Sequence, residues 1–237
     1  MRLILLIITL PLILLVTGCR IDSESISAAT TDRASYSGSN AIVRLPQPRQ
    51  DSDVSIEQSL VKRRSTRSYS GEPLNLTEIS QLLWAAQGIT DLGGHRTAPS
   101  AGALYPLEVY LLAGNVEGLE AGIYKYLPEK HELNLMVGGD YRDELSAAAL
   151  MQESVADGAI AVVFTAVYER TTVKYGERGI RYVHIELGHA SQNLCLQAAA
   201  MDLGVVTVGA FTDERVAEVL DLSDDEKPLY IIPVGRK

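Results

Sequence analysis

One uncharged stretch in the second half of the chain constrains the fold more than any other feature. Residues 159–167 read Ala-Ile-Ala-Val-Val-Phe-Thr-Ala-Val, a run rich in β-branched residues. A continuous apolar strand of this kind is typical of a central position in a sheet whose two faces are both covered. The rest of the chain must therefore cover both faces, and we expect a layered domain around this strand.

Capping residues and hydrophobic periodicity predict the elements around this strand. Two capping-box spacings, Ser-x-x-Gln and Asn-x-x-Glu, begin helices over 55–64 and 75–88. Apolar residues at steps of three and four predict a long helix over 182–201, closed by Gly204. The other expected elements are a strand at 107–112, a hairpin over 122–137, a helix over 140–152, a strand at 205–208, a helix over 213–220 and a strand at 229–234. This mixture of hairpin and crossover connections predicts an α+β domain built on one sheet.

The N-terminus carries an uncharged run over residues 3–16, preceded by Arg2. Because the run is shorter than the ~20 residues that cross a bilayer as a helix, we assign residues 1–18 to an export signal. The following Val-Thr-Gly-Cys19 resembles a bacterial lipobox, in which the cysteine is acylated. The sequence therefore predicts a lipoprotein, exported and anchored through Cys19 to a membrane of the cell envelope. The alternative is an ordinary cleavage site beside an incidental cysteine.

Residues 19–53 are rich in serine, alanine, threonine and aspartate and show neither the helical nor the strand period. We expect them to form a flexible tether. The globular part is then residues 54–237, a single domain by size. Its one thiol is Cys195, so we predict no disulfide within the mature chain.

Charge and motif spacing exclude several classes of function. The 237 residues carry a formal net charge of −9 without a long basic run, so a nucleic-acid partner is not expected. His184 and His189 lie five residues apart on the long helix, which places their side chains about 140° apart and prevents a shared metal ion. The sequence has no Walker-type or Rossmann glycine motif, which excludes those two kinds of nucleotide site.

Three short segments stand out by their chemistry. Residues 62–67 place four cations and two hydroxyls together, a composition that suits one phosphate group, although a solvated helix end explains this segment better when it is taken alone. Residues 98–106 place small residues between two prolines, which allows a flat ring to lie against the backbone. The third segment is Val-Thr-Val-Gly-Ala-Phe at 206–211, together with Pro-Val-Gly-Arg-Lys at 233–237.

The order of these motifs resembles the FMN-dependent nitroreductase family across residues 54–237. The shared motifs are Arg-Arg-Ser-x-Arg, Pro-Ser-x-Gly-x-Leu-Tyr-Pro, Gly-His-x-x-Gln-Asn-Leu on the long helix, Val-Gly-Ala and a terminal Gly-Arg. The chain looks most similar to the branch of the thiazoline/oxazoline oxidases, the SagB-type dehydrogenases. The resemblance implies a nitroreductase-like fold, with a central mixed but mainly antiparallel sheet flanked by helices. It also implies an intertwined homodimer with two sites at the interface, in which helix 182–201 is a dimer element and Cys195 a buried structural thiol.

The resemblance implies FMN as the cofactor and assigns its contacts residue by residue. The residues expected to hold the phosphate and ribityl chain are Arg63, Arg64, Ser65, Arg67 and Arg236. Those expected to line the isoalloxazine ring are Pro99, Ser100, Ala101, Gly102 and Ala103, with Val208, Gly209 and Ala210 near its N5 edge. Many relatives carry an acidic residue just before that glycine, whereas Val208 is apolar, which leaves the hydrogen bonding at N5 open.

Lys174 and Tyr175 match the pair that the azoline oxidases place over the flavin before the long helix. Dehydrogenation of a C–H bond next to a heteroatom needs a base, and a desolvated lysine or tyrosine can act as one. The alternative is a surface Lys-Tyr dipeptide. The expected location outside the cytoplasm departs from those oxidases, which act in cytosolic peptide-modifying complexes.

The sequence therefore predicts an FMN-dependent oxidoreductase that transfers two electrons between a small or peptide-derived substrate and flavin. Two alternatives stay open. One is an NAD(P)H-dependent nitro or quinone reductase, and the other is a flavin-binding lipoprotein that has lost turnover.

Overall fold

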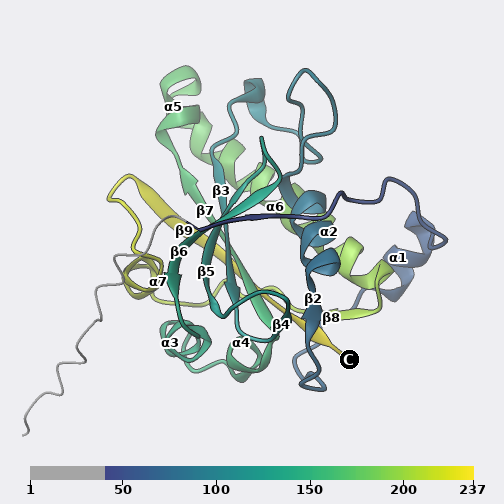
Figure 1. Cartoon of the computed structure of the whole chain (residues 1–237). Helices are drawn as coiled ribbons and strands as arrows, with labels where there is room; N and C mark the ends of the chain where they lie inside the picture. Colours follow the sequence, from purple (N-terminus) through teal and green to yellow (C-terminus); the bar gives the residue numbers. More distant parts are fainter. Residues whose placement is uncertain (1–40) are drawn as a thin grey trace, which may run out of the picture. The chain divides into compact units, whose positions relative to one another are not determined.

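The computed structural model describes residues 41–237 (Figure 1). The expected export signal and the acylation site Cys19 lie outside the described residues. A seven-stranded sheet forms the centre of the described part, with the strand order β1-β6-β5-β3-β7-β9-β8. Every strand pair in it is antiparallel, whereas the short strands β2 (Leu74–Asn75) and β4 (Val116–Glu117) form a parallel pair. The prediction of an α+β fold on a mixed, mainly antiparallel sheet is confirmed.

Strand β7 (Ile160–Val167) is the predicted central strand, and its side chains alternate between two cores. Ile160, Val162 and Phe164 belong to one core cluster, whereas Ala161 and Val163 belong to the other. All five are fully buried. The continuous apolar run therefore results from burial on both faces of the sheet.

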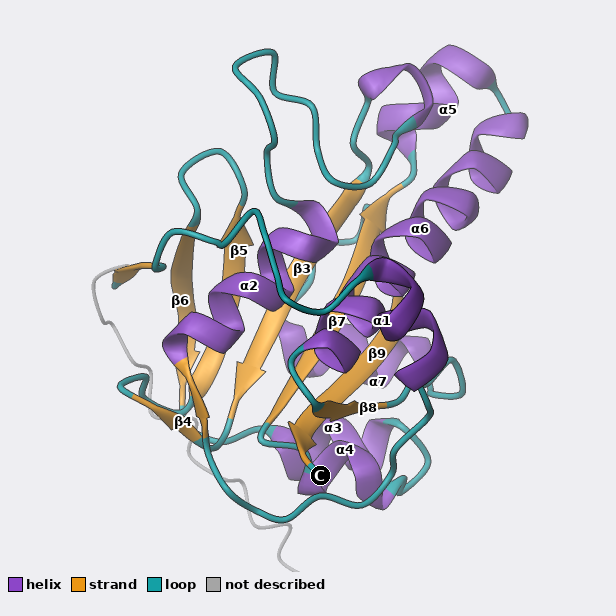
Figure 2. Cartoon of the chain, turned by 90° about the vertical axis from the view of Figure 1, so that its right-hand side faces the viewer, coloured by secondary structure: helices purple, strands orange, loops and turns teal. Residues whose placement is uncertain are grey.

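Helices cover the two faces of the sheet as two layers (Figure 2). One layer is built by α1 (Ile56–Lys62), α2 (Leu76–Gln87) and α6 (Arg178–Ala200). The opposite layer is built by α3 (Arg142–Ala148), α4 (Glu153–Asp157) and α7 (Asp213–Leu220). Helix α5 (Glu169–Tyr175) and the N-terminal end of α6 project beyond the sheet.

The other strands of the large sheet agree with the sequence pattern or extend it. They are β1 (Ile42–Arg44), β3 (Leu107–Ala113), β5 (Gly122–Leu127), β6 (Glu132–Gly138), β8 (Leu203–Val205) and β9 (Glu226–Arg236). The hairpin over 122–137 and the capping box of α2 form as predicted, and α2 ends at Gly88 as expected.

The boundary between tether and domain is a correction to the sequence analysis. Residues 42–44 were assigned to the tether at 19–53, but they pair with β6 as the edge strand β1. Farther along, the backbone of Arg49 exchanges two hydrogen bonds with the Gln81 side chain of α2. The sequence missed this part because one edge strand of three residues shows no period of its own.

Three predicted elements differ in their bounds. The helix expected over 140–152 is only α3 and ends at Ala148, because Leu150 and Met151 adopt left-handed backbone angles with φ of 59°; the short helix α4 that follows was not predicted. Gly204 lies in β8 instead of closing the long helix, which ends at Ala200 and turns through Asp202 with φ of 57°. The strand expected over 205–208 is β8, which starts two residues earlier and ends three residues earlier, and a separate bridge joins Val208 to Ile231.

Helix α5 was not predicted as a helix, and its position depends on a close contact with α6. Gly179 in α6 lies against the backbone of Thr172, where a Cβ atom would meet the Thr172 Cα at 2.9 Å. A glycine here lets the two helices approach closely. Among residues 41–237, no helix is both long and apolar enough to span a bilayer.

Candidate functional site

The segment after α1 is fixed to the sheet through its backbone. Ser65 forms a parallel bridge with Val205, and the Thr66 N–H donates to the Val205 carbonyl at 2.9 Å. Thr66 packs on Gly204, where a Cβ would meet its Cγ2 at 2.9 Å. These contacts hold the cationic segment beside β8, on the side of the sheet that carries α6.

A cavity of about 250 Å³ lies between this segment and α6. Its lining residues come from α1's end, α6, the chain after β8 and β9, and are Arg63, Ser65, Gly188, Ser191, Gln192, Cys195, Val205, Val206, Thr207 and Tyr230. Two of the five predicted phosphate contacts, Arg63 and Ser65, are therefore at the cavity. Burial raises the pKa of the Cys195 thiol to about 11, and the nearby charge of Arg63 lowers it. Cys195 is buried as predicted, and the thiol rather than the thiolate lines the cavity.

Gly188 forms part of the cavity wall and has open space beside it. It lies in the interior of α6, where glycine costs about 1 kcal/mol relative to alanine. A Cβ built there meets no atom within 4 Å, so the packing of this chain does not require glycine. A flat or chain-like ligand that lies against the helix would require it.

The other predicted phosphate contacts are placed differently. Arg64 turns back and donates from Nη1 to the carbonyls of Val61 and Arg63 at 2.9 and 2.7 Å, and Arg67 is exposed outside the cavity lining. Arg236 does not line the cavity, and its guanidinium forms a bidentate ion pair with Glu78 at 2.8 and 3.0 Å. That pair fixes the last strand to the capping box of α2.

Val208 also lies away from the cavity. Its side chain is 3 % exposed in the core beneath α7, and its N–H and carbonyl both pair with Ile231 at 2.8 and 3.0 Å. The residue therefore presents neither side chain nor backbone to a ligand. Gly209 and Ala210 are exposed, and the carbonyl of Ala210 accepts from the Gln152 side chain. The cavity is instead lined by the two residues before Val208, which the sequence analysis did not assign.

The loop at 99–103 is strained and open to solvent. Gly102 has a φ of 66°, and Ala103 and Tyr105 follow with φ of 54° and 45°. Left-handed angles at residues other than glycine cost of order 1 kcal/mol each and often mark functional sites. The Ser100 Oγ accepts from the Tyr105 N–H at 2.9 Å, which holds this turn together. Pro99, Gly102 and Ala103 are exposed, and Ser100 and Ala101 are half-buried.

Lys174 and Tyr175 converge on that loop. A Cβ on Gly102 would lie 2.8 Å from the Tyr175 hydroxyl and 2.9 Å from the Lys174 Nζ. Lys174 Nζ lies 5.4 Å above the Tyr175 ring, and the Tyr175 ring meets that of Tyr182 edge-on at 5.2 Å. The two predicted catalytic side chains therefore lie beside the predicted ring-binding loop and come from a separate helix.

Arg170 fixes the geometry of this meeting point. Its Nη1 donates to the Tyr105 carbonyl at 3.1 Å, and its Nη2 pairs with Glu108 of β3. Lys125 of β5 also pairs with Glu108, at 3.3 Å. The loop, the start of α5 and the sheet are thereby joined by one ion-pair network.

The loop packs against α6 through buried polar contacts that the sequence analysis missed. Glu186 is 2 % exposed, and burial raises its pKa to about 7, while the Ser100 hydroxyl and the charge of Arg96 lower it. Asn193 lies two turns farther along α6 and donates to the Thr97 carbonyl at 3.2 Å. The buried glutamate breaks the helix's apolar stripe, and that break was the available sequence signal.

The two parts of the site lie on opposite sides of α6. At 100° per residue, Gly188 and Cys195 point about 140° to 180° away from Glu186 and Asn193. The cavity and the loop at 99–103 of one chain are therefore separated by the helix.

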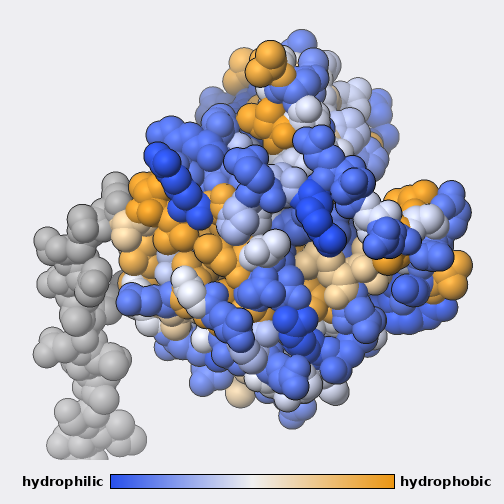
Figure 3. All heavy atoms as spheres, turned by 45° about the vertical axis from the view of Figure 1, so that its right-hand side comes forward, coloured by the Kyte–Doolittle hydropathy of each residue, from blue (hydrophilic) through white to orange (hydrophobic). Residues whose placement is uncertain are grey.

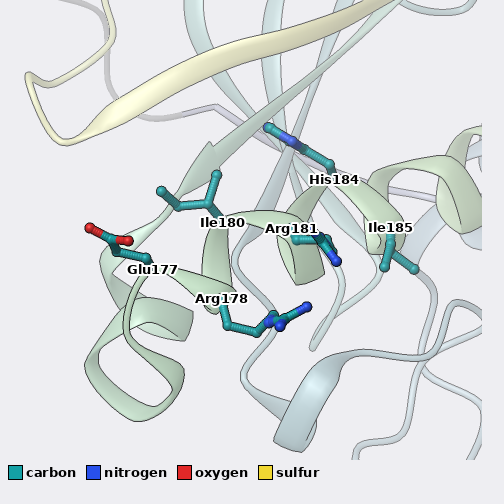
Figure 4. A pocket seen from close by; sticks show the side chains of 6 residues that line it. All are labelled: Glu177, Arg178, Ile180, Arg181, His184 and Ile185. Carbon is teal, nitrogen blue, oxygen red and sulfur yellow. The ribbon is translucent and has the colours of Figure 1, made fainter.

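A second hollow continues the cavity side of α6 toward its N-terminus (Figure 4). Its lining residues come from successive turns of the helix and are Glu177, Arg178, Ile180, Arg181, His184 and Ile185. Many of these residues and the cavity residues are seven positions apart, as in Arg181 and Gly188 or Ile185 and Gln192. One exposed stripe of α6 thus runs from its N-terminus to Gln192 with the spacing of a helix-pairing seam.

The chain matches the family model described as Nitroreductase family over residues 60–236. This chain belongs to the nitroreductase family. Its members are flavin oxidoreductases, which agrees with FMN as the predicted cofactor.

Two named proteins are similar in sequence to this chain. It is 48 % identical over 185 residues to MJ1384 of Methanocaldococcus jannaschii, named as a nitroreductase, covering 78 % of this chain and 92 % of that protein. It is 33 % identical over 158 residues to the microcin B17-processing protein McbC of Escherichia coli, covering 63 % of this chain and 57 % of McbC. The similarity to a processing protein agrees with the predicted SagB-type branch.

Solved structures share the fold. A nitroreductase structure from Anabaena variabilis matches with a TM-score of 0.74 and 33 % identity, over 83 % of this chain and 42 % of that one. The E. coli microcin synthetase McbBCD, solved with truncated pro-MccB17 bound, matches with a TM-score of 0.67 and 28 % identity, over 81 % of this chain and 77 % of the matched chain.

Proposed function

We propose that this chain is a homodimeric FMN-dependent dehydrogenase or oxidase of the SagB type, acting on a small or peptide-derived substrate. The observation that carries the proposal is the convergence of Lys174, Tyr175 and Gly102. When bound, FMN supplies the two-electron acceptor. The Lys174 Nζ and the Tyr175 hydroxyl are the groups placed to take the proton from a substrate C–H bond next to a heteroatom.

The small volume of the cavity supports a site built from two chains. About 250 Å³ is less than the ~300 Å³ at the low end of cofactor and ligand pockets, so one chain holds part of the cofactor. Arg63 and Ser65 suit its phosphate end. Since α6 separates the loop at 99–103 from this cavity, we infer that each loop serves the flavin held by the other chain.

Exposed apolar side chains support the same arrangement. They gather on α1 and on the projecting α5–α6 end, and are Ile56, Leu60, Val61, Val173, Ile180 and Ile185, exposed by 44 % to 79 %. Figure 3 shows apolar atoms on both projecting lobes, where Figure 1 places α1 and α5. Apolar surface of this kind is typical of an interface between subunits.

A mixed-dimer experiment tests the two-chain site. Arg63→Ala damages the cavity and Gly102→Val damages the loop, so each homodimer should lose FMN. If the site uses both chains, the Arg63→Ala/Gly102→Val heterodimer has one site with two intact halves and should bind one FMN per dimer. If the site lies within one chain, the heterodimer has no intact site and stays colourless, which would refute the arrangement. Sedimentation of the parent protein as a flavin-loaded monomer would refute it too.

Turnover separates the oxidase from a reductase. The alternative is NAD(P)H-dependent reduction of nitro compounds or quinones, and the similarity to MJ1384, named as a nitroreductase, agrees with it. Steady-state reduction of a nitroaromatic panel with NADPH at rates typical of enzymes would favour that alternative. A protein with stoichiometric FMN and no turnover of either kind would be a flavin-binding protein.

We also propose that Cys19 anchors the protein, on the lipobox-like Val-Thr-Gly-Cys sequence alone. Metabolic labelling with an alkynyl fatty acid should fail in Cys19→Ser and succeed in Cys195→Ser. Labelling that persists in Cys19→Ser would contradict the proposal.

A further inference from the structure

Tyr105 is held in a strained conformation just after the loop at 99–103. Its backbone has a φ of 45°, an angle that is costly for any residue except glycine and persists only where the surroundings fix it. Three contacts from three segments of the chain fix it here. Its N–H donates to the Ser100 Oγ at 2.9 Å, its carbonyl accepts from Arg170 Nη1 at 3.1 Å, and its ring lies 4.4 Å below the Arg96 guanidinium.

Arg96 is itself held in place, so it can hold the ring of Tyr105. Its Nη1 donates to the Gln87 side chain and its Nη2 to Glu129, both at 3.0 Å. The Arg96 side chain is 11 % exposed, and Gln87 is fully buried at the end of α2. A guanidinium bonded at both ends has little freedom to move, and the aromatic ring beneath it is held by the cation–π contact.

Tyr105 connects the loop at 99–103 with helix α5. Through its N–H it holds the Ser100 side chain and with it the turn of the loop. Through its carbonyl it holds Arg170, which lies one helical turn before Lys174 on the same face of α5. The position of this one residue therefore bears on the loop and on the predicted catalytic lysine together.

We propose that Tyr105 is a positioning residue that sets where the loop at 99–103 lies relative to Lys174 and Tyr175, and that Arg96 holds it there. This inference rests on the proposed function, in which the loop binds flavin and the pair handles protons. Without the ring contact, the strained backbone is free to relax, and its two hydrogen-bond partners move with it. The ring acts through its face and not through its hydroxyl, so phenylalanine should replace it.

The first measurement uses the protein without FMN and is independent of the proposed function. Amide hydrogen exchange followed by NMR has one probe on each side of Tyr105. The Ala103 N–H, which donates to the Ser100 carbonyl at 3.1 Å, reports on the loop. The Gly176 N–H, which donates to the Thr172 carbonyl at 2.7 Å, reports on the end of α5.

Tyr105→Ala and Arg96→Lys should each make both amides exchange about tenfold faster, because each variant removes the cation–π contact. The double variant should exchange no faster than either single variant, since both changes act through one contact. Tyr105→Phe should keep the parental rates. Arg44→Lys, which changes an arginine on β1 whose side chain is 89 % exposed, is the matched control.

Two results would overturn the inference. One is a parental exchange rate at either amide in Arg96→Lys, a variant that tests the contact even if Tyr105→Ala does not fold. The other is an additive effect in the double variant, which would mean that the two residues act independently.

The second measurement is the affinity for FMN, obtained by isothermal titration. A loop that is not held in place must be ordered on binding, so Tyr105→Ala and Arg96→Lys should bind FMN about tenfold more weakly than the parent. Tyr105→Phe should bind it as the parent does. Faster exchange with unchanged FMN affinity would overturn the positioning role. A parent that binds no FMN would refute the proposed function, and the exchange rates would still decide whether Arg96 holds Tyr105.

Discussion

The two sides of helix α6 have different surroundings. On the cavity side, Gly188 and Cys195 face open space beside a cationic segment that is fixed by backbone bonds. On the loop side, Glu186 and Asn193 are packed against a strained loop that is held by side-chain hydrogen bonds. The residues expected to bind FMN are held by backbone hydrogen bonds. The groups suited to proton transfer lie where side chains hold the loop in place. The experiments below test this division.

The largest expected effect is on the loop side. Lys174→Ala and Tyr175→Phe should slow the reduction of bound flavin by substrate about 10²–10⁴-fold, the contribution typical of a positioned acid or base. FMN affinity should stay at the parental value, because neither residue lines the cavity. Stopped-flow single-turnover reduction measures the rate, and Lys130→Ala in the β5–β6 turn is the matched control.

Dithionite should reduce all of these proteins at the same rate, since it does not need the base. Reduction of both variants by substrate at the parental rate would remove the division between binding and chemistry and the main support for the oxidase branch.

On the cavity side, Arg63→Ala should weaken FMN binding by about 2–4 kcal/mol, the value of one or two charge-assisted hydrogen bonds. Arg236→Ala is the informative comparison. Since Arg236 pairs with Glu78, this variant should unfold at lower denaturant concentration and keep the parental FMN affinity. Isothermal titration with FMN measures the affinity, and urea unfolding measures the stability. If Arg236→Ala loses FMN affinity and Arg63→Ala does not, Arg236 holds the phosphate.

Glu186 should also set part of the pH dependence of folding. Its pKa is raised to about 7 from 4.5, so the folded state holds a proton that the unfolded state has lost. The free energy of unfolding therefore falls as pH rises from about 4.5 to about 7, by about 3 kcal/mol at most, and Glu186→Gln should lack this decrease.

His131 contributes the opposite slope, because burial lowers its pKa and its contribution is lost as pH falls below about 6.5. The measurement is accordingly the difference between variant and parent in urea unfolding at each pH. A difference that does not change between pH 5 and pH 8 would contradict the protonated acid.

The smallest effect concerns the two helix glycines of α6. Gly188→Ala should raise the stability of the FMN-free protein by up to about 1 kcal/mol and weaken FMN binding, because its Cβ points into the cavity. Gly179→Ala is the matched control and should destabilise, since its Cβ would meet the Thr172 backbone at 2.9 Å. Unchanged FMN affinity in Gly188→Ala would mean that no ligand lies against this part of α6.

Local patterns in the sequence were sufficient for most of the fold. The apolar run of β7, the capping box of α2 and the period of α6 each depend on neighbours along the chain, which is why the sheet, the helices and the family could be predicted. The sequence also identified the cationic segment, the loop at 99–103 and the Lys174–Tyr175 pair. It missed β1, which is stabilised by β6 far away in the chain, and the short helices α4 and α5.

Only the tertiary structure decided which side chains meet. Arg236 and Val208 belong to the right motifs, but one is bound to Glu78 and the other is buried with its backbone paired to Ile231. Conversely, Gly188 became significant through the space beside it, and Glu186 through burial against Ser100. A motif fixes the identity and spacing of residues along the chain, whereas the direction of each side chain depends on packing and hydrogen bonds between segments that are distant in sequence.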